Sequence, residues 1–143
     1  MTTALYDTDF YIWATRQADL LRNEDYAELD RDNLIEEIEA MAKRDRRELE
    51  SRIRGILTHL LKWKYQPNRR SSSWTNSIDE QRDQIEPILK DSPSLRRELP
   101  DMIVDAYATA IRKAAKQTKL PVNAFPARCE WTLEQILDED FLP

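Results

Sequence analysis

Apolar residues recur at steps of three and four positions along most of the chain, and this spacing predicts amphipathic α-helices. The first run predicts a helix of about four turns that Asp7 or Thr8 caps and that residues 23–25 close. Its apolar positions are Phe10, Trp13, Ala14, Ala18 and Leu21.

A longer run of the same kind extends over residues 31–65, with Asp30 as its cap. Its apolar positions are Leu34, Ile35, Ile38, Met41 and Ala42 and, after the polar stretch 43–48, Leu49, Ile53, Ile56, Leu57, Leu60, Leu61 and Trp63. Because neither proline nor glycine lies near the polar stretch, the pattern fits either one helix or two helices joined near 42–45. The second part is apolar over a wide arc, which predicts that it is the central helix.

Residues 65–73 predict a linker, because Pro67 disfavours helix at the residue before it and the serines that follow can cap a helix. The next helix is expected over residues 74–89. Pro87 is expected to kink or end it, because proline removes a backbone donor.

Ser92 followed by Pro93 is a helix-start signal and predicts a short turn that reaches Leu99. A further helix is expected from Pro100 through Ala114, where small residues allow close packing of neighbouring helices. Residues 120–129 then predict an extended segment that lies on the body of the fold.

The end of the chain carries a signature for one short helix. Thr132 and Gln135 have the spacing of a capping box, and Trp131 can pack against Ile136 as a hydrophobic staple. The turn-forming and capping residues are therefore consistent with the helical spacing.

The fold class follows from these patterns and from the glycine content. The one glycine, Gly55, leaves no means of building the many tight turns of an all-β chain. We expect an all-α, single-domain helical bundle over residues 1–143, with about five to seven helices, an extended C-terminal segment and a short last helix.

Cysteine content and hydropathy predict a soluble, cytoplasmic protein. Cys129 is the one cysteine, so an intrachain disulfide and a thiol-rich zinc site are excluded. The N-terminus does not resemble a signal peptide, and the apolar stretches are shorter than the roughly 20 residues that cross a bilayer.

The charge is unevenly distributed along the chain. Residues 1–42 hold 3 basic and 11 acidic residues, for a net charge of −8, whereas residues 43–82 hold 11 basic and 5 acidic, for a net +6. The whole chain carries −5. We therefore favour acidic and basic helices that complement each other over a nucleic-acid surface, which the net charge disfavours.

The first candidate site is centred on His59, the one histidine. Arg54 precedes it by five positions, a spacing that resembles the motif of HEPN domains, which are helical, metal-independent endoribonucleases. An arginine can stabilise phosphorane charge while a histidine moves a proton. On a helix the two would lie about 140° apart, so Arg52, seven positions before His59, is the alternative partner. The other interpretation is a half-buried structural histidine that is hydrogen-bonded to a neighbouring helix, with Gly55 allowing close backbone approach.

The second candidate is a polar group at the start of the 31–65 helix, Asp30, Asn33, Glu36, Glu37 and Glu39, of which Asp30, Asn33 and Glu37 fall along one edge of the apolar positions. Such an edge is typical of ion pairs and hydrogen bonds, but a mononuclear metal site at Glu37 and His59 is the alternative. The repeated Glu-x-x-His spacing of helical di-metal sites is not found.

The third candidate is an interaction surface around the linker, formed by Trp63, Arg69, Arg70 and Trp74. Aromatic rings interleaved with arginines can stack on a ligand. Alternatively, the arginines lie over the rings or pair with the acidic helix.

Several segments together resemble the domain of unknown function 29 family of bacteria, which is common in cyanobacteria. They are residues 6–14, 29–41, 59–67, 73–74, 92–95, 125–126, 129 and 135–138. The resemblance covers nearly the whole chain and implies an all-α fold, and it brings no activity. Family members often have Met-Gly where this chain has Met41-Ala42, which bears on a helix break there. They often have Cys-Pro where this chain has Cys129-Glu130, which predicts a less rigid tail.

These patterns favour a small helical interaction module that binds a protein partner or itself, rather than an enzyme. They specify no cofactor and no substrate. The endoribonuclease at His59 with Arg52 or Arg54, and the metal site at Glu37 and His59, are the alternatives.

Overall fold

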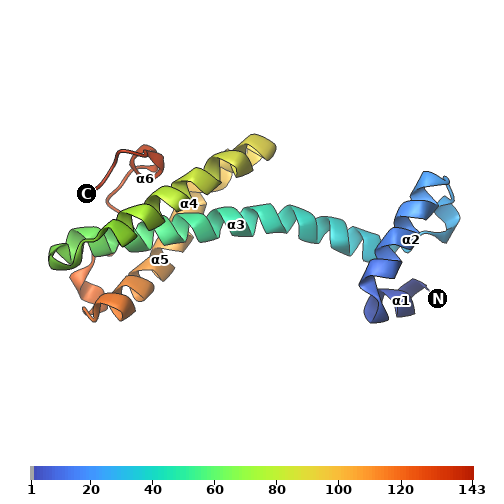
Figure 1. The fold of residues 1–143 in the computed structure, drawn as a ribbon, viewed down its shortest axis with the longest axis horizontal. Helices are drawn as coiled ribbons and strands as arrows, with labels where there is room; N and C mark the ends of the chain where they lie inside the picture. The colour runs from blue at the N-terminus through green and yellow to red at the C-terminus, as the bar shows by residue number, and fades with distance from the viewer. Residues whose placement is uncertain (1) are drawn as a thin grey trace. The chain divides into compact units, whose positions relative to one another are not determined.

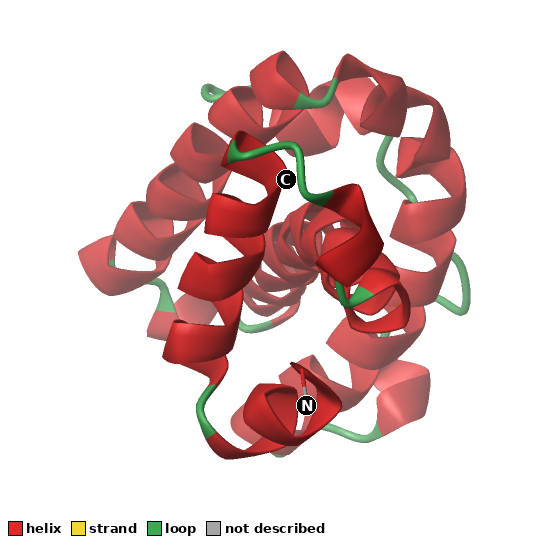
Figure 2. Cartoon of the chain, turned by 90° about the vertical axis from the view of Figure 1, so that its right-hand side faces the viewer, coloured by secondary structure: helices red, strands yellow, loops and turns green. Residues whose placement is uncertain are grey.

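The structure is a computed structural model that describes residues 2–143, with side chains from Leu5 onward. Its α-helices are α1 (Thr2–Thr8), α2 (Phe10–Arg22), α3 (Arg31–Tyr65), α4 (Ser72–Asp91), α5 (Leu99–Thr118) and α6 (Leu133–Leu137) (Figure 1). Short 3₁₀ turns connect them: η1 (Tyr26–Glu28), η2 (Pro67–Arg69), η3 (Pro93–Glu98) and η4 (Val122–Ala124). The prediction of an all-α fold is confirmed, since Figure 2 shows helices joined by short loops and no strand in residues 2–143.

The contacts divide the chain into two compact units, one up to Arg44 and one from Asp45 to Pro143. Each unit is described by itself. That residues 1–143 act as one domain stays a prediction.

The first unit contains α1, α2, η1 and the beginning of α3. The expectation that Asp7 or Thr8 caps the first helix was wrong, because both residues belong to α1. Asp9, the residue between α1 and α2, is the cap, and its carboxylate accepts a hydrogen bond from the backbone N–H of Ile12 at 3.1 Å. After α2, Glu24 takes a left-handed conformation (φ 59°) that turns the chain, as the 23–25 signal predicted.

Hydrogen bonds to Asp30 hold the interior of the first unit together. Trp13 and Gln17 of α2 are buried, and Asp30 directly precedes α3. The Trp13 indole N–H donates to the Asp30 carboxylate at 3.0 Å, and the Asp30 backbone N–H donates to the Gln17 side-chain oxygen at 2.8 Å. These bonds satisfy polar groups that burial would otherwise leave without water.

The 31–65 segment is one continuous helix of 35 residues, which resolves the choice between one helix and two. The polar stretch 43–48 introduces neither a missing backbone donor nor a flexible glycine, so nothing in it interrupts the hydrogen-bond ladder. Burial changes along the helix, however. From Leu49 onward its apolar side chains enter the core, as the sequence predicted for a central helix.

The core of the second unit lies among the C-terminal part of α3, α4 and α5 (Figure 1). It includes Leu49, Ile53, Ile56, Leu57, Leu60, Leu61, Ile78, Ile85, Leu99, Met102, Ala106 and Ala110. Gly55 lets the Gln81 side chain of α4 lie close to α3, since a Cβ there would stand 3.3 Å from two carbons of Gln81. The neighbour at Gly55 is thus a side chain of α4 rather than the backbone that was expected to approach there.

At Pro87 and at Ser92 the structure differs from a simple helix end and a simple helix cap. Pro87 lies within α4, which continues to Asp91, so the helix ends one turn beyond it. Ser92 was expected to cap the following turn, but its hydroxyl donates to Asp45 of α3 at 3.2 Å instead. A tertiary acceptor within reach has replaced the local cap.

The C-terminal segment crosses α5 and ends in the short helix α6. Lys119, in a left-handed conformation (φ 62°), terminates α5. The segment 120–129, predicted to be extended, contains no α-helix but includes the 3₁₀ turn η4, with extended backbone at Pro121 and Phe125 on either side of it. The capping box of Thr132 and Gln135 is present in full, with both side chains bonded to backbone N–H groups at the start of α6. Within residues 2–143, none of the helices has the length and apolar character needed to cross a membrane.

Candidate interaction surfaces

The aromatic and basic residues around the linker form cation–ring pairs. The Arg70 guanidinium lies 4.8 Å from the centre of the Trp63 ring, and its Nε donates to the Trp63 carbonyl at 2.8 Å. The Lys62 ammonium lies 4.7 Å from the Trp74 ring centre and donates to Gln117. Each ring therefore has a cation of this chain over one face, and Arg69 is exposed beside them. Their role as an interaction surface stays a prediction.

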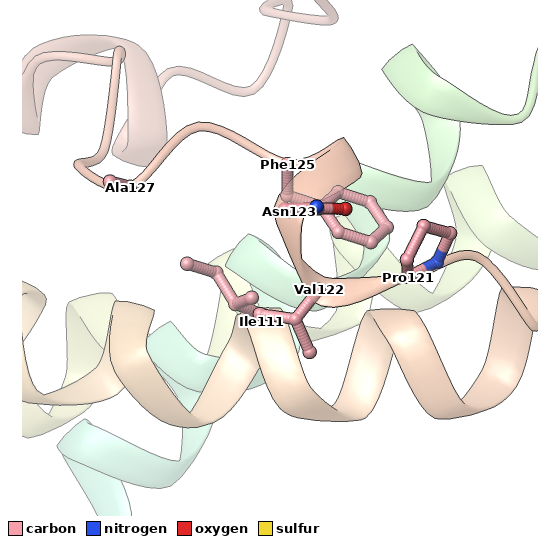
Figure 3. Close-up of a pocket in the computed structure, with 6 residues that line it drawn as sticks. All are labelled: Ile111, Pro121, Val122, Asn123, Phe125 and Ala127. Atoms are coloured by element: carbon pink, nitrogen blue, oxygen red, sulfur yellow. The ribbon is translucent and has the colours of Figure 1, made fainter.

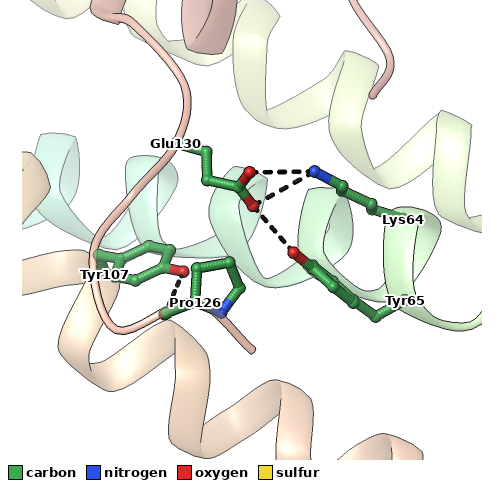
Figure 4. A network of polar contacts seen from close by, with 5 residues as sticks. All are labelled: Lys64, Tyr65, Tyr107, Pro126 and Glu130. Atoms are coloured by element: carbon green, nitrogen blue, oxygen red, sulfur yellow. Dashed lines mark hydrogen bonds and ion pairs between the residues drawn. The ribbon is translucent and has the colours of Figure 1, made fainter. Parts of the chain in front are cut away.

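A polar network fixes the C-terminal segment to the end of α3 (Figure 4). Glu130 accepts the Tyr65 hydroxyl at 2.8 Å, and both of its oxygens lie 3.2 Å from the Lys64 ammonium. These partners lower the pKa of Glu130, and the Glu130 carboxylate raises the pKa of Lys64. Tyr107 of α5 donates to the Pro126 carbonyl at 2.7 Å, and burial raises its pKa.

An apolar pocket lies where the C-terminal segment passes over α5. Figure 3 shows this pocket, where Ile111 of α5 lies with Val122 and Phe125 of the segment. A neighbouring hollow is lined by Val104 and Tyr107 together with Cys129 and Trp131. Burial raises the pKa of the Cys129 thiol, and its Sγ lies 3.6 Å from the Trp131 carbonyl. Cys129 is therefore a protonated, packed side chain rather than an activated nucleophile.

The members of the predicted catalytic group all lie on α3, and each has its own surroundings. His59 is half-buried, and its Nδ1 lies 3.0 Å from the Gly55 carbonyl of its own helix. Burial lowers the pKa of His59, so the imidazole is neutral at pH 7. Arg52 bonds to Gln81 at 3.2 Å and to Glu48 at 3.5 Å. Arg54 is half-exposed on α3. RNA cleavage by this group stays a prediction.

The residues of the predicted metal site have separate surroundings. Glu37 belongs to the first unit and accepts a hydrogen bond from the Tyr6 hydroxyl, which raises the pKa of Tyr6 to about 12. His59 belongs to the second unit, 22 positions later on α3. In the part of the chain from Thr2 onward, no group of three or more His, Cys, Asp or Glu side chains is arranged to hold a metal ion.

The polar edge that includes Asp30 and Asn33 is a set of hydrogen bonds, as expected. The Asn33 amide donates to the Asp30 carboxylate at 2.8 Å. The same Asp30 oxygen accepts the Trp13 indole N–H, so this oxygen has two donors within the unit. The sequence identified Asp30 and Asn33 from their spacing. It did not identify Trp13 and Gln17 as their partners, because helix periodicity does not say which helix packs against which.

The first unit leaves a row of large apolar side chains exposed on α3. We name Leu34, Ile35, Ile38, Met41 and Ala42 the α3 stripe. Within it, Ile35 is 43%, Ile38 63% and Met41 62% exposed. On α2, Phe10, Tyr11 and Ile12 are also at least half exposed. The spacing that predicted the stripe is confirmed, but these side chains are not in the buried core.

Comparison with known families matches residues 5–142 to the family described as "Domain of unknown function DUF29". This chain belongs to the DUF29 family. The match covers nearly the full length, so the resemblance inferred from the sequence motifs is confirmed. No curated protein and no solved structure matches the chain.

The sequence resemblance drew attention to two positions of this DUF29 chain, Ala42 and Glu130. Ala42 stands inside the unbroken α3, so the helix has no break at Met41-Ala42. Glu130 bonds to Lys64 and Tyr65, and that it leaves the tail less rigid than a proline would stays a prediction. A carboxylate with two partners restrains the segment through its side chain, which is a tertiary effect that the local sequence does not reveal.

Proposed function

We propose that this DUF29 chain is a helical interaction module that binds a protein partner or a second copy of itself through the α3 stripe. The exposure of Ile38 and Met41 is the observation that carries the proposal. Both side chains stand on a helix whose later apolar positions, from Leu49 onward, are buried as helical spacing requires. A row of exposed large apolar side chains on a regular helix is typical of a protein contact.

The charged residues that border the stripe add specificity to this surface. Residues 1–42 carry a net charge of −8, which includes Glu36, Glu37 and Glu39 beside the stripe. A partner other than a second copy is expected to pair a complementary apolar row with basic or neutral flanks. The linker tryptophans are less suited to this role, because Arg70 and Lys62 already cover one face of each ring.

A cytoplasmic location is part of this proposal. A lone Cys129, half-buried in its thiol form, requires no oxidising compartment. Such a location would also supply the protein partners that the stripe needs.

A photo-crosslinking amino acid in place of Met41 tests the contact in lysate of the source organism. We expect a defined adduct, either with a second copy or with one other protein, that disappears when Ile38→Lys is added. Arg16, exposed on α2, is the matched control position in the same unit. Labelling from Met41 no stronger than labelling from position 16, or labelling that Ile38→Lys leaves unchanged, would overturn the proposal.

A further inference from the structure

We infer that the partner of the α3 stripe is the α3 stripe of a second copy, packed antiparallel about a two-fold axis at Ile38. This inference rests on the proposed function and adds the identity of the partner. It follows from the order of apolar and charged positions along α3 together with their exposure.

The stripe is symmetric about Ile38 in its spacing. At 100° per residue, positions three, four and seven away from Ile38 in either direction share its face. Before Ile38 these positions are Ile35, Leu34 and Arg31, and after it they are Met41, Ala42 and Asp45. The face is thus apolar at its centre and charged at both ends.

In an antiparallel pair of α3 helices, the positions before Ile38 in one copy lie against the positions after Ile38 in the other. A two-fold axis at Ile38 places each Ile38 against its copy. It brings Ile35 across from Ala42 on one flank and Leu34 across from Met41 on the other, with each pair offset by one residue along the helix axis. Every apolar position of the stripe then meets an apolar position, which is the self-complementarity that an isologous interface requires.

The ends of the face pair charges of opposite sign. The same axis brings Arg31 level with Asp45 of the other copy, whose carboxylate also accepts the Ser92 hydroxyl of its own chain. A parallel pair would instead place Arg31 against Arg31 and Asp45 against Asp45. The charge order therefore selects the antiparallel arrangement.

The net charge opposes association, so the apolar contact must drive it. Two copies of the acidic segment 1–42 repel each other, but charges separated by more than a Debye length of about 8 Å at physiological salt are largely screened. The flanking Glu37 is already bonded to Tyr6 beside the stripe. The large exposed fractions of Ile35, Ile38 and Met41 are the surface that such a contact removes from water.

Light scattering after size exclusion and disulfide trapping test this inference on the full chain. We expect a species of twice the 17.0 kDa chain mass, and we expect Ile38→Glu to weaken it by roughly 100-fold or more, since the charge would be buried without a partner. Circular dichroism of Ile38→Glu verifies that the helices remain.

Disulfide trapping reports the register of the two α3 helices even if Ile38→Glu disturbs folding. In a Cys129→Ala background, Ile38→Cys is expected to link to its own copy under mild oxidation. Ile12→Cys, equally apolar and half exposed on α2, is the matched control and is not expected to link. A mixture of Ile35→Cys and Ala42→Cys chains is expected to give the mixed dimer in preference to either homodimer.

A chain that is monomeric at all concentrations, or an Ile38→Cys chain that links no faster than Ile12→Cys, would overturn the inference. The outcome for the proposed function can be distinguished from the outcome for this inference. If the chain is monomeric but the Met41 probe labels one other protein in an Ile38-dependent way, the module binds a different partner. If neither dimer nor labelling is found, both proposals are wrong.

Discussion

Arg82 of α4 donates a hydrogen bond through Nε to the carbonyl of Ile136 in α6, 2.9 Å away and 54 positions later in the chain. Its two terminal nitrogens donate to the carbonyls of Phe141 and Gln135, at 3.0 and 3.3 Å. The side chain is buried, so these carbonyls have a charged donor where water has little access. One arginine thus anchors the end of the chain to the core.

Arg82→Leu is therefore expected to lower the free energy of unfolding by about 2–4 kcal/mol, because it leaves carbonyls without their charged donor. Urea unfolding followed by circular dichroism measures the change. Hydrogen exchange of residues 133–141 should rise most. Arg82→Lys keeps the charge but not the planar fork, so an intermediate loss is expected. Wild-type stability in Arg82→Leu would show that the anchor contributes nothing.

The core of the second unit should be sensitive to truncation at α3. Leu57→Ala removes a fully buried side chain and is expected to cost about 2–5 kcal/mol, from lost burial and the cavity left behind. Val104→Ala on α5, where the side chain is 68% exposed, is the control and should change stability by less than about 0.5 kcal/mol. Equal effects of the two substitutions in urea unfolding would contradict this description of the core.

The first unit depends on the hydrogen bonds to Asp30. Asp30→Ala leaves the Trp13 indole N–H and the Asn33 amide without their acceptor, at a cost of about 1–3 kcal/mol for a buried donor. Hydrogen exchange of α2 should accelerate correspondingly. Asp30→Asn retains an acceptor and should show a smaller change, and exposed Asp25→Ala should show none. Unchanged exchange in Asp30→Ala would mean that these bonds do not hold the unit.

His59 makes stability depend on pH in a definite direction. Burial lowers the pKa of His59 below its ordinary value of about 6.5, so the unfolded chain binds the proton more readily than the folded chain. The contribution of His59 is therefore fully present above pH 6.5 and is lost as the pH falls from there toward the lower pKa of the folded state. His59→Gln cannot titrate, so its urea midpoint should fall less between pH 7.5 and 5.5. Parallel curves for both proteins would refute the prediction.

Helix caps were predicted correctly where the hydrogen-bond partners lie within a few residues of each other in the sequence. The capping box of Thr132 and Gln135 forms as its spacing predicts, because both hydrogen bonds span three positions. The cap at Asp9 was misplaced, since α1, which has no strong apolar period, was not anticipated. The cap expected at Ser92 did not form, and its hydroxyl instead donates to Asp45, which is distant in sequence.

The contacts of the candidate-site residues could not be predicted from helical periodicity, because periodicity does not say which side chains meet in the folded chain. His59, Arg52 and Arg54 share one helix, yet Gln81 and Glu48 engage Arg52, while the imidazole of His59 lies against Gly55 of its own helix. The contribution of Glu130 to the tail also depends on Lys64 and Tyr65, which lie some 65 positions earlier.

The sequence by itself determined the helices of this DUF29 chain, because an apolar residue once per turn favours one backbone geometry through local hydrogen bonds and burial of a single face. It also predicted that α3 carries apolar residues along its length. The wide apolar arc after Leu49 also predicted the central part of α3, but only the tertiary structure decided that the stripe before it stays exposed. Leu57 and Ile38 are both apolar positions of one helix, but α4 and α5 pack around the first, whereas the second remains exposed.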